Sequence, residues 1–519
     1  MSRLKRLLFL GFLTAFFLSY LGPIIEGDFF HHLVEGRSIW EGGDIKAGFP
    51  TQWLGQVMLY LLWEVSGWGG IVFLRAVVYT TALLVLYFRM RKDGVGALGC
   101  VFFLLLPAYM FLSFPSERPQ MLSFLLFPLC VYLLERARKA GGKSPYLLLP
   151  LFVLWGNIHP GFLLGVAAVW IYFIAGLIRI ALGRASFKDL KATAAIALLT
   201  ALAFAVMPSA LKSLPGLILS FIHPSPYMET IQEYLSPLSA ALELGEYYPA
   251  YWLALLLTAY ALISGGKKMP LEHILMLVFF GLLPFKGLRF MPYFTMLSPL
   301  IALGTARKDW EESRFLFFGF IGVLVLWLVF VPVRPAPGLS PEFPEKAVGF
   351  LKKAGPRGKV FNYHGWAGYL SWAFPESRLF IPVSGSLQDV DEAYDKILRA
   401  EGAMTFAGPE WRALLEAYGL DVILIPGASP VTGRMYPLVD ALQSETDWYL
   451  IYSDESANIL LRATPANRET ISLNSLPKAN IYLQVMAQTE RYLKDDPKKP
   501  GLKETLQTAK ERLQPKKTF

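Results

Sequence analysis

A polar turn between two apolar runs decides the fold class of this chain. Residues 95–113 read VGALGCVFFLLLPAYMFLS, residues 114–120 read FPSERPQ, and residues 121–134 read MLSFLLFPLCVYLL. Neither apolar run holds a charged residue, and an α-helix of about 20 apolar residues is long enough to cross a bilayer. Comparable runs recur through the first 333 positions, which predicts a polytopic α-helical membrane protein with about eleven transmembrane helices. We expect these spans near 7–25, 70–88, 95–113, 121–134, 146–157, 161–180, 192–208, 249–264, 270–285, 290–306 and 315–333.

The composition of the 519 residues agrees with this class. Hydrophobic residues make up 54% and charged residues only 17%, whereas a soluble protein carries about 25% charged residues. Two cysteines exclude a disulfide scaffold, and the apolar content excludes disorder. The net charge of +9 would suit nucleic-acid binding, but its distribution along the chain indicates membrane topology instead.

Basic residues alternate from one connection between spans to the next. Every second connection is rich in Lys and Arg, with 19 basic against 6 acidic residues, while the alternate connections hold 6 basic and 11 acidic ones. The positive-inside rule then places the N-terminus in the cytoplasm and the acidic connections outside. We expect a multi-pass protein of the cytoplasmic membrane, with long outer loops at 26–69 and 209–248, and an odd number of spans that leaves everything after residue 333 outside. In the first outer loop, Trp53, Leu54, Val57 and Met58 recur at helical spacing, which suits helices at the membrane interface or helices packed over the bundle.

Polar residues gather at the outer ends of the spans. Ionisable groups at a bilayer margin are expensive unless they are paired or hydrated, so a functional role is the first hypothesis. Carboxylates suit a general base or a metal ligand, arginines suit a phosphate clamp, and amides or histidines suit sugar hydroxyls. The candidates are Asp28, His32, Gln52, Arg118, Gln120, Asn157, His159, Glu233 and Arg289. Asp28 has a structural alternative, because Asp is favoured at a helix start.

Residues after the proline-rich stretch 332–344 have a soluble-like composition. Strands are expected at 359–362, 378–381, 422–425, 448–452 and 458–462, with helices at 344–354, 391–401 and 409–418. Strands that alternate with helices predict a small α/β domain. The expected organisation is therefore a membrane domain at 1–333, an outer α/β domain at 334–465, and a charged helical tail with a solvated face at 466–519.

Several ordered motifs resemble those of the bacterial multispanning GT-C-type glycosyltransferases. The stretches that carry the resemblance are Gly27-Asp28…His32, Gln52-Trp53-Leu54, Arg118-Pro119-Gln120, Asn157-Ile-His159-Pro-Gly161, Gln232-Glu233-Tyr234, Arg289-Phe290 and Asn362…Trp366-Ala-Gly368-Tyr369. This likeness implies an enzyme that takes a sugar from a polyprenyl-phosphate donor, with Asp28 as its catalytic acidic residue. Relatives often have an acidic residue and an arginine where this chain has Ser384-Gly385-Ser386, so a ligand role for that loop is not expected.

The expected function is glycosyl transfer on the outer membrane face, to a glycan, lipid or protein acceptor. Asp28 would act as general base or hold a divalent ion; no fixed-spacing metal motif is present, so no cofactor is assigned. Two other functions fit the sequence less well. A lipid or lipid-linked-sugar transporter would spread its polar groups through the membrane depth, and a non-catalytic envelope assembly protein would not need polar residues at one level.

Overall fold

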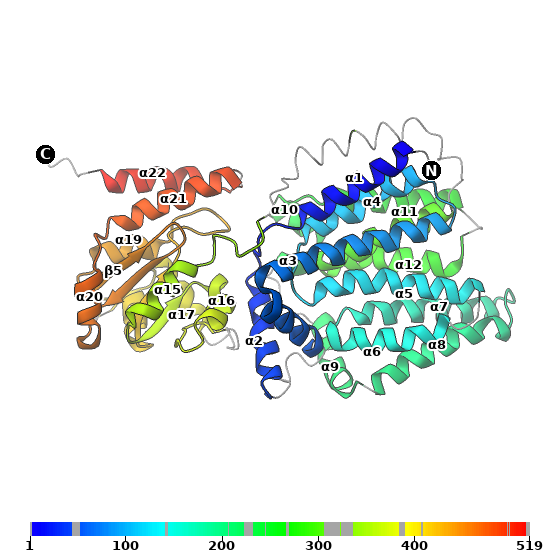
Figure 1. Ribbon diagram of the computed structural model, residues 1–519, viewed down its shortest axis with the longest axis horizontal. Coiled ribbons are helices and arrows are strands. Elements are labelled where there is room, and N and C mark those ends of the chain that lie inside the picture. The colour runs from blue at the N-terminus through cyan, green and yellow to red at the C-terminus, as the bar shows by residue number, and fades with distance from the viewer. Residues whose placement is uncertain are drawn as a thin grey trace. The chain divides into compact units, whose positions relative to one another are not determined.

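The computed structural model describes residues 3–43, 52–140, 144–205, 207–222, 232–243, 245–265, 269–305, 322, 336–382, 390–405, 408–495, 497 and 499–514. The described residues are 71% helical, with a small sheet in the C-terminal part (Figure 1). It divides into two compact units, a helical unit of residues 1–24 and 35–338 and a C-terminal unit of residues 25–34 and 339–519. The division at residue 338 lies close to the boundary expected at residue 333, but residues 25–34 belong with the C-terminal part.

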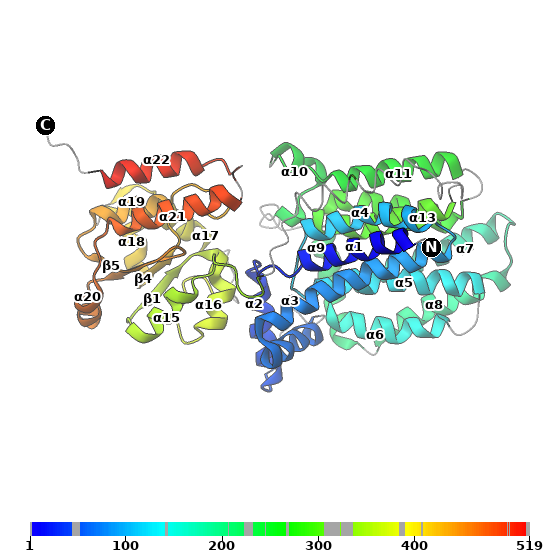
Figure 2. The same cartoon turned by 45° about the horizontal axis from the view of Figure 1, so that its top comes forward.

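The helical unit is a bundle whose long helices lie side by side (Figure 1, Figure 2). Ten of the eleven expected spans fall on a helix, and the eleventh, 315–333, lies outside the described residues apart from residue 322. The long helices are α1 (Arg3–Ser19), α3 (Trp53–Lys92), α4 (Ala97–Ser113), α5 (Gln120–Ala140), α6 (Leu148–Ile158), α7 (Phe162–Ala181), α8 (Phe187–Ala205), α9 (Pro208–Ile222), α11 (Pro249–Gly265), α12 (Leu271–Leu282) and α13 (Met291–Thr305). The short helix α10 (Pro237–Glu243) follows α9.

The described part of the chain has three helices that are long and apolar enough to cross a membrane. They are Trp53–Lys92, Gln120–Arg138 and Phe162–Ala181, and six further apolar helices span 10–17 residues. A span needs roughly 17–25 residues. Of the six shorter helices, only Ala97–Ser113 reaches the lower end of that range, and the other five are shorter than it.

The described residues of the segment 26–69, which was expected to form an outer loop, are largely helical. Helix α2 covers Asp28–Trp40, and α3 begins at Trp53, well before the span expected from residue 70. A kink at Gly67 separates the first part of α3 from the rest, because Gly67 has φ 59° and ψ −159°. Glycine adopts this backbone conformation at low cost, since it has no Cβ. The residues around Trp53 therefore form the first part of α3, which continues beyond the kink through the span expected at 70–88.

A buried arginine fixes the end of α1 to the rest of the bundle. Arg75 on α3 is only 3% exposed, and its guanidinium donates to the backbone carbonyls of Tyr20 and Gly22 at 2.6 Å each. It also forms an ion pair with Glu117, which is fully buried in the connection between α4 and α5. Carbonyls at a helix end have no partner within the helix, so Arg75 satisfies them while Glu117 neutralises its charge.

A second buried ionic cluster lies where α5, α7 and α12 meet. Glu135 pairs with Arg138 at 3.0 Å and with His273 at 2.8 Å, and it accepts a hydrogen bond from Tyr172 at 2.5 Å. Glu272 pairs with Arg179 at 2.9 Å. Because both carboxylates have basic partners, this cluster has a structural explanation.

The C-terminal unit contains a four-stranded mixed sheet in the order β1-β4-β6-β5. Its strands are β1 (Lys359–Asn362), β4 (Leu420–Ile425), β5 (Trp448–Ser453) and β6 (Asn458–Arg462), and β1 pairs with β4 in parallel while the other pairs are antiparallel. A separate two-residue pair joins β2 (Met404–Thr405) and β3 (Gly408–Pro409). Helices accompany the sheet: α15 (Glu345–Ala354), α16 (Ala367–Ala373), α17 (Asp391–Arg399), α18 (Glu410–Ala417), α19 (Pro437–Ser444), α20 (Arg468–Asn474), α21 (Asn480–Asp495) and α22 (Leu502–Leu513). The predicted α/β domain is confirmed.

The strand expected at 378–381 is reduced to a single bridge between Val360 and Leu379. The physical reason is the side chain of Asn362, which is fully buried. Its amide accepts a hydrogen bond from the Ile381 N–H and donates one to the Ile381 carbonyl, each at 3.1 Å. A side-chain amide thus replaces the backbone ladder beside residue 381.

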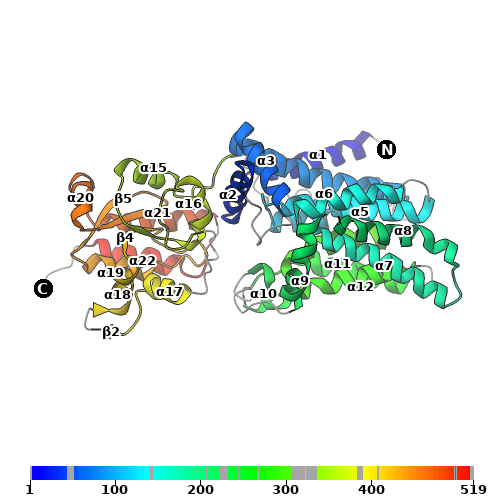
Figure 3. The same ribbon diagram turned by 90° about the horizontal axis from the view of Figure 1, so that it is seen from below.

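The helical tail was wrongly separated from the α/β domain. Helices α21 and α22 lie side by side against the sheet domain (Figure 2, Figure 3), and Ile481, Val485 and Ala509 are fully buried in the same hydrophobic core as Phe361 and Ile423. Each helix is amphipathic: apolar residues line one face, although charged residues separate them in the sequence. The charged face is solvated, and the apolar face packs in the core. The C-terminal unit therefore extends to α22.

Candidate functional site

Three of the sequence motifs converge in the helical unit. Gly55, in the first turn of α3, lies so close to the next two motifs that a Cβ there would be 2.8 Å from Pro119 Cβ and 2.9 Å from the Ile158 carbonyl. Trp53 donates from its indole N–H to the Asn157 side-chain oxygen at 2.7 Å. The stretches around Trp53, Arg118 and Asn157 therefore form one polar region at the ends of α3, α5 and α6.

Two arginines from distant connections meet at one carboxylate in this region. Arg118 Nη2 is 3.2 Å from Glu233 Oε2, and Arg289 Nη1 is 4.0 Å from Glu233 Oε1. The Arg289 guanidinium also lies over the Tyr234 ring, 4.0 Å from its centre. The backbone joins the same segments, because the Leu288 N–H donates to the Leu235 carbonyl at 3.0 Å. The cluster thus joins Arg118 to Glu233, 115 positions later in the sequence, and to Arg289, 171 positions later.

Among the described residues, the Arg118–Glu233–Arg289 cluster brings two guanidinium groups to one carboxylate. The three side chains remain 19–30% exposed. The Nε of Arg289 is buried and has no hydrogen-bond partner among the described residues. An arginine whose donors are not all used, beside a second arginine, suits a planar or tetrahedral oxyanion.

His159 is neutral beside this cluster. Burial, together with the positive charges of Arg118 and Arg289, lowers its pKa to about 3. The Nδ1 atom accepts the Gly161 N–H at 2.9 Å and lies 2.9 Å from the Ser123 hydroxyl. We therefore assign the ring proton to Nε2, which makes His159 a neutral donor.

The remaining candidates lie at helix ends or in the other unit. Gln120 is the first residue of α5 and is partly buried, and Gln52 directly precedes α3. Asp28 is the exposed first residue of α2, and His32 is buried one turn later. Asp28 and His32 belong to the C-terminal unit, whereas Arg118, Asn157, His159, Glu233 and Arg289 belong to the helical unit.

Three contributors to the site were not predicted. Ser123 links His159 to Trp155, whose indole N–H donates to the Ser123 hydroxyl at 2.7 Å. Tyr234 supplies the ring beneath Arg289, and Ser116 accepts a hydrogen bond from the Arg118 backbone N–H at 3.1 Å. Tyr234 and Ser116 stand inside the quoted motifs, but Ser123 lies in an apolar run where nothing distinguishes it.

Within the described residues, no group of three or more His, Cys, Asp or Glu side chains is arranged to hold a metal ion. A divalent ion at Asp28 thus stays a prediction from the sequence. The loop at 384–386, where no ligand role was expected, lies outside the described residues.

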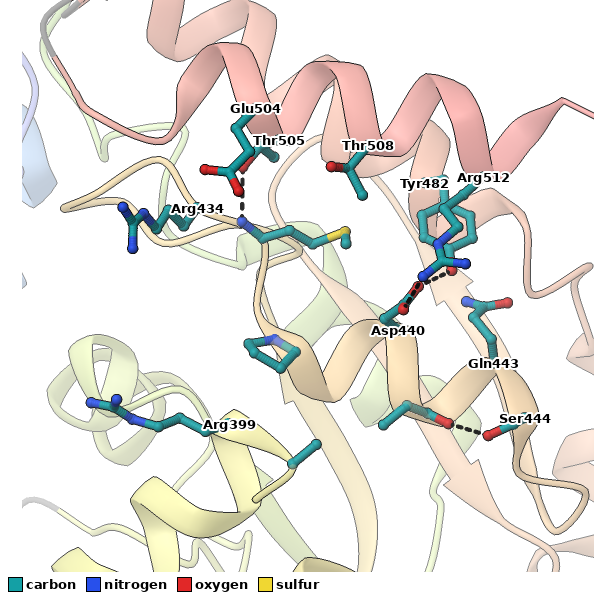
Figure 4. Close-up of a pocket in the computed structure, with 14 residues that line it drawn as sticks. Arg399, Arg434, Asp440, Gln443, Ser444, Tyr482, Glu504, Thr505, Thr508 and Arg512 are labelled. Carbon is teal, nitrogen blue, oxygen red and sulfur yellow. Dashed lines mark hydrogen bonds and ion pairs between the residues drawn. The ribbon is translucent and has the colours of Figure 1, made fainter. Parts of the chain in front are cut away.

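A hollow of about 830 Å³ in the C-terminal unit is lined by polar residues of α19, α21 and α22 (Figure 4). Most of its charged groups already have partners. Asp440 accepts from Arg512 and from the Tyr482 hydroxyl at 2.6 Å each, and Arg399 pairs with Asp395 at 2.9 Å. The hollow therefore lacks the concentrated charge of the Arg118–Glu233–Arg289 cluster.

The sequence matches no protein-family model and no curated protein. A functional assignment therefore depends on the chemistry of the residues above. The strongest chemical feature is the Arg118–Glu233–Arg289 cluster with its neutral histidine.

Proposed function

We propose that this protein is an integral-membrane glycosyltransferase of the GT-C type. It would move a sugar from a polyprenyl-phosphate donor to an acceptor on the outer face of the cytoplasmic membrane. The observation that carries the proposal is the Arg118–Glu233–Arg289 cluster beside neutral His159. These groups match a donor that is anionic at its phosphate and rich in hydroxyls at its sugar.

The arginines would act on the leaving group. Cleavage of the bond between sugar and phosphate leaves negative charge on the phosphate, and preorganised cationic donors stabilise charge that develops in a transition state. Glu233 keeps Arg118 and Arg289 in place before the donor binds, since it contacts both. His159, a neutral donor through Nε2, and Asn157, oriented by Trp53, would hold sugar hydroxyls.

Asp28 would supply the general base or hold a divalent ion. Its carboxylate is exposed at the first residue of α2. An accessible carboxylate can serve as the general base that takes a proton from an acceptor hydroxyl. Gln52, Gln120 and His32 complete the proposed set of substrate-binding residues.

A membrane location is part of the proposal. The helical unit exposes large apolar side chains on several helices, including Phe88 at 63%, Leu256 at 67% and Ile263 at 84%. Large apolar surfaces of this kind are uncommon on a soluble monomer and suit contact with lipid. The alternating basic connections then place the N-terminus in the cytoplasm and the C-terminal unit outside.

Purified protein in liposomes, supplied with radiolabelled polyprenyl-phosphate sugars and membrane-lipid acceptors, tests the proposal. We expect sugar transfer by the unaltered chain and a loss of about 10²–10³-fold in kcat for Arg118→Ala or Arg289→Ala, the magnitude typical for loss of one charge-stabilising donor. Lys286→Ala is the matched control, because Lys286 is an exposed basic residue three positions before Arg289. Movement of labelled lipid between leaflets without sugar transfer would instead show a transporter.

A further inference from the structure

The turn that carries Asp28 packs against the α16 region of the C-terminal unit. A Cβ on Gly27 would be 2.7 Å from the Gly365 carbonyl oxygen, and a Cβ on Gly368 would be 2.5 Å from the Gly27 carbonyl oxygen. Real Cβ atoms do not approach other atoms so closely. The two backbones meet at this distance because both Gly27 and Gly368 lack a side chain.

An aromatic cluster holds the next residues of α2 in the same place. Phe30 is fully buried, and its ring packs edge-on against Phe343 at 5.0 Å and against Tyr369 at 5.1 Å between ring centres. Phe343 and Tyr369 are themselves 5.3 Å apart. Gly368 and Tyr369 are neighbours on α16, so one short helix supplies both the glycine contact and one wall of the cluster.

We infer that the C-terminal unit positions Asp28, with Gly368 and Tyr369 as positioning residues. This inference rests on the proposed function of Asp28. It gives the C-terminal unit a part in catalysis. Asp28 itself is exposed, so its orientation comes from Gly27 on one side and from Phe29 and Phe30, both fully buried, on the other.

Glycine variants of the full-length chain test the inference from both sides of the contact. Gly368→Ala and Gly27→Ala each introduce a methyl group into the close approach, and neither glycine has a positive φ that would add backbone strain. Gly349→Ala is the matched control, because Gly349 lies on α15 and a Cβ there meets nothing within 4 Å. All three proteins keep every ionisable group.

The first readout is amide hydrogen exchange, measured by mass spectrometry on residues 25–34. We expect exchange there to rise at least tenfold in Gly368→Ala and Gly27→Ala and to stay unchanged in Gly349→Ala. Exchange in β4 reports whether the sheet remains folded, so unchanged protection there excludes general unfolding. Unchanged exchange at 25–34 in both test variants overturns the inference.

The second readout is sugar transfer. We expect kcat to fall at least tenfold in both test variants with the donor KM changed less than twofold, because the donor-binding cluster is untouched. Raised exchange with an unchanged kcat also overturns the inference. If the unaltered chain transfers no sugar, the proposed function fails, while the exchange data still decide whether α16 holds the Asp28 turn.

Discussion

Loss of either partner of the buried Arg75–Glu117 pair should destabilise the helical unit strongly. Glu117→Gln leaves Arg75 with a buried positive charge, and removing one partner of a buried pair costs about 3–5 kcal/mol. Arg75→Met leaves the Glu117 carboxylate buried alone and also removes the donors to the carbonyls of Tyr20 and Gly22. Each orphaned carbonyl adds about 1–3 kcal/mol, so we expect Arg75→Met to be the more damaging change.

The double variant Arg75→Met with Glu117→Gln distinguishes the energy of the ion pair from that of the hydrogen bonds to the two carbonyls. It removes both charges, so its loss of unfolding free energy should be smaller than the sum of the two single losses by at least about 1 kcal/mol, which double-mutant cycles resolve. Thermal unfolding of the purified protein in detergent, followed by tryptophan fluorescence, measures all four states of the cycle. Strictly additive losses, or a single-variant loss below about 1 kcal/mol, would refute the argument that Arg75 and Glu117 stabilise each other.

Two further predictions follow from burial and charge. Ile481→Ala on α21 should lower the unfolding free energy by about 2–5 kcal/mol. Leu483 is 53% exposed on the same helix, so Leu483→Ala should change the unfolding free energy by less than about 0.5 kcal/mol. Equally small effects of both variants in chemical denaturation would show that α21 is not part of the folded core. The pKa of about 3 for His159 lies below its unfolded value of about 6.5, so only the unfolded chain takes up a proton between these values. Stability should therefore fall with decreasing pH below about 6.5, by up to about 1.4 kcal/mol per pH unit more in the unaltered protein than in His159→Gln. Identical pH profiles of thermal unfolding would contradict a neutral His159 in the folded protein.

Apolar runs predicted most of the helices, because helix length and composition are local properties of a sequence. Four of the five strands were also located, since β-branched and aromatic residues stand in short runs between turn residues. The missing strand shows where this reasoning stops. Asn362 takes over the pairing of Ile381 through its side chain, and no periodic pattern signals such a replacement.

The polar residues of the site were identified individually, but their grouping depends on tertiary packing. Glu233 and Arg289 meet Arg118 only because three distant connections converge, and sequence order does not determine that convergence. Asp28 was expected in the same domain as the arginines, but it belongs to the C-terminal unit. The packing of its turn against α16 depends on the close approach of Gly27 and Gly368. The sequence does not indicate which residue a glycine packs against.

The consecutive residues Ser116, Glu117 and Arg118 have different roles: Glu117 is held in the core, and Arg118 extends into the candidate site. Glu117 is held in the core by Arg75, while Ser116 accepts the Arg118 backbone N–H at 3.1 Å. With Glu117 fixed inward and the turn closed by Ser116, the Arg118 side chain can extend to Glu233. Arg75 touches neither Arg118 nor Glu233 through any contact described above, yet by holding Glu117 it fixes the backbone from which the Arg118 side chain extends. A variant of Arg75 that still folds should therefore lose donor affinity as well as stability, whereas Ile481→Ala, which weakens only the C-terminal unit, should lose stability alone.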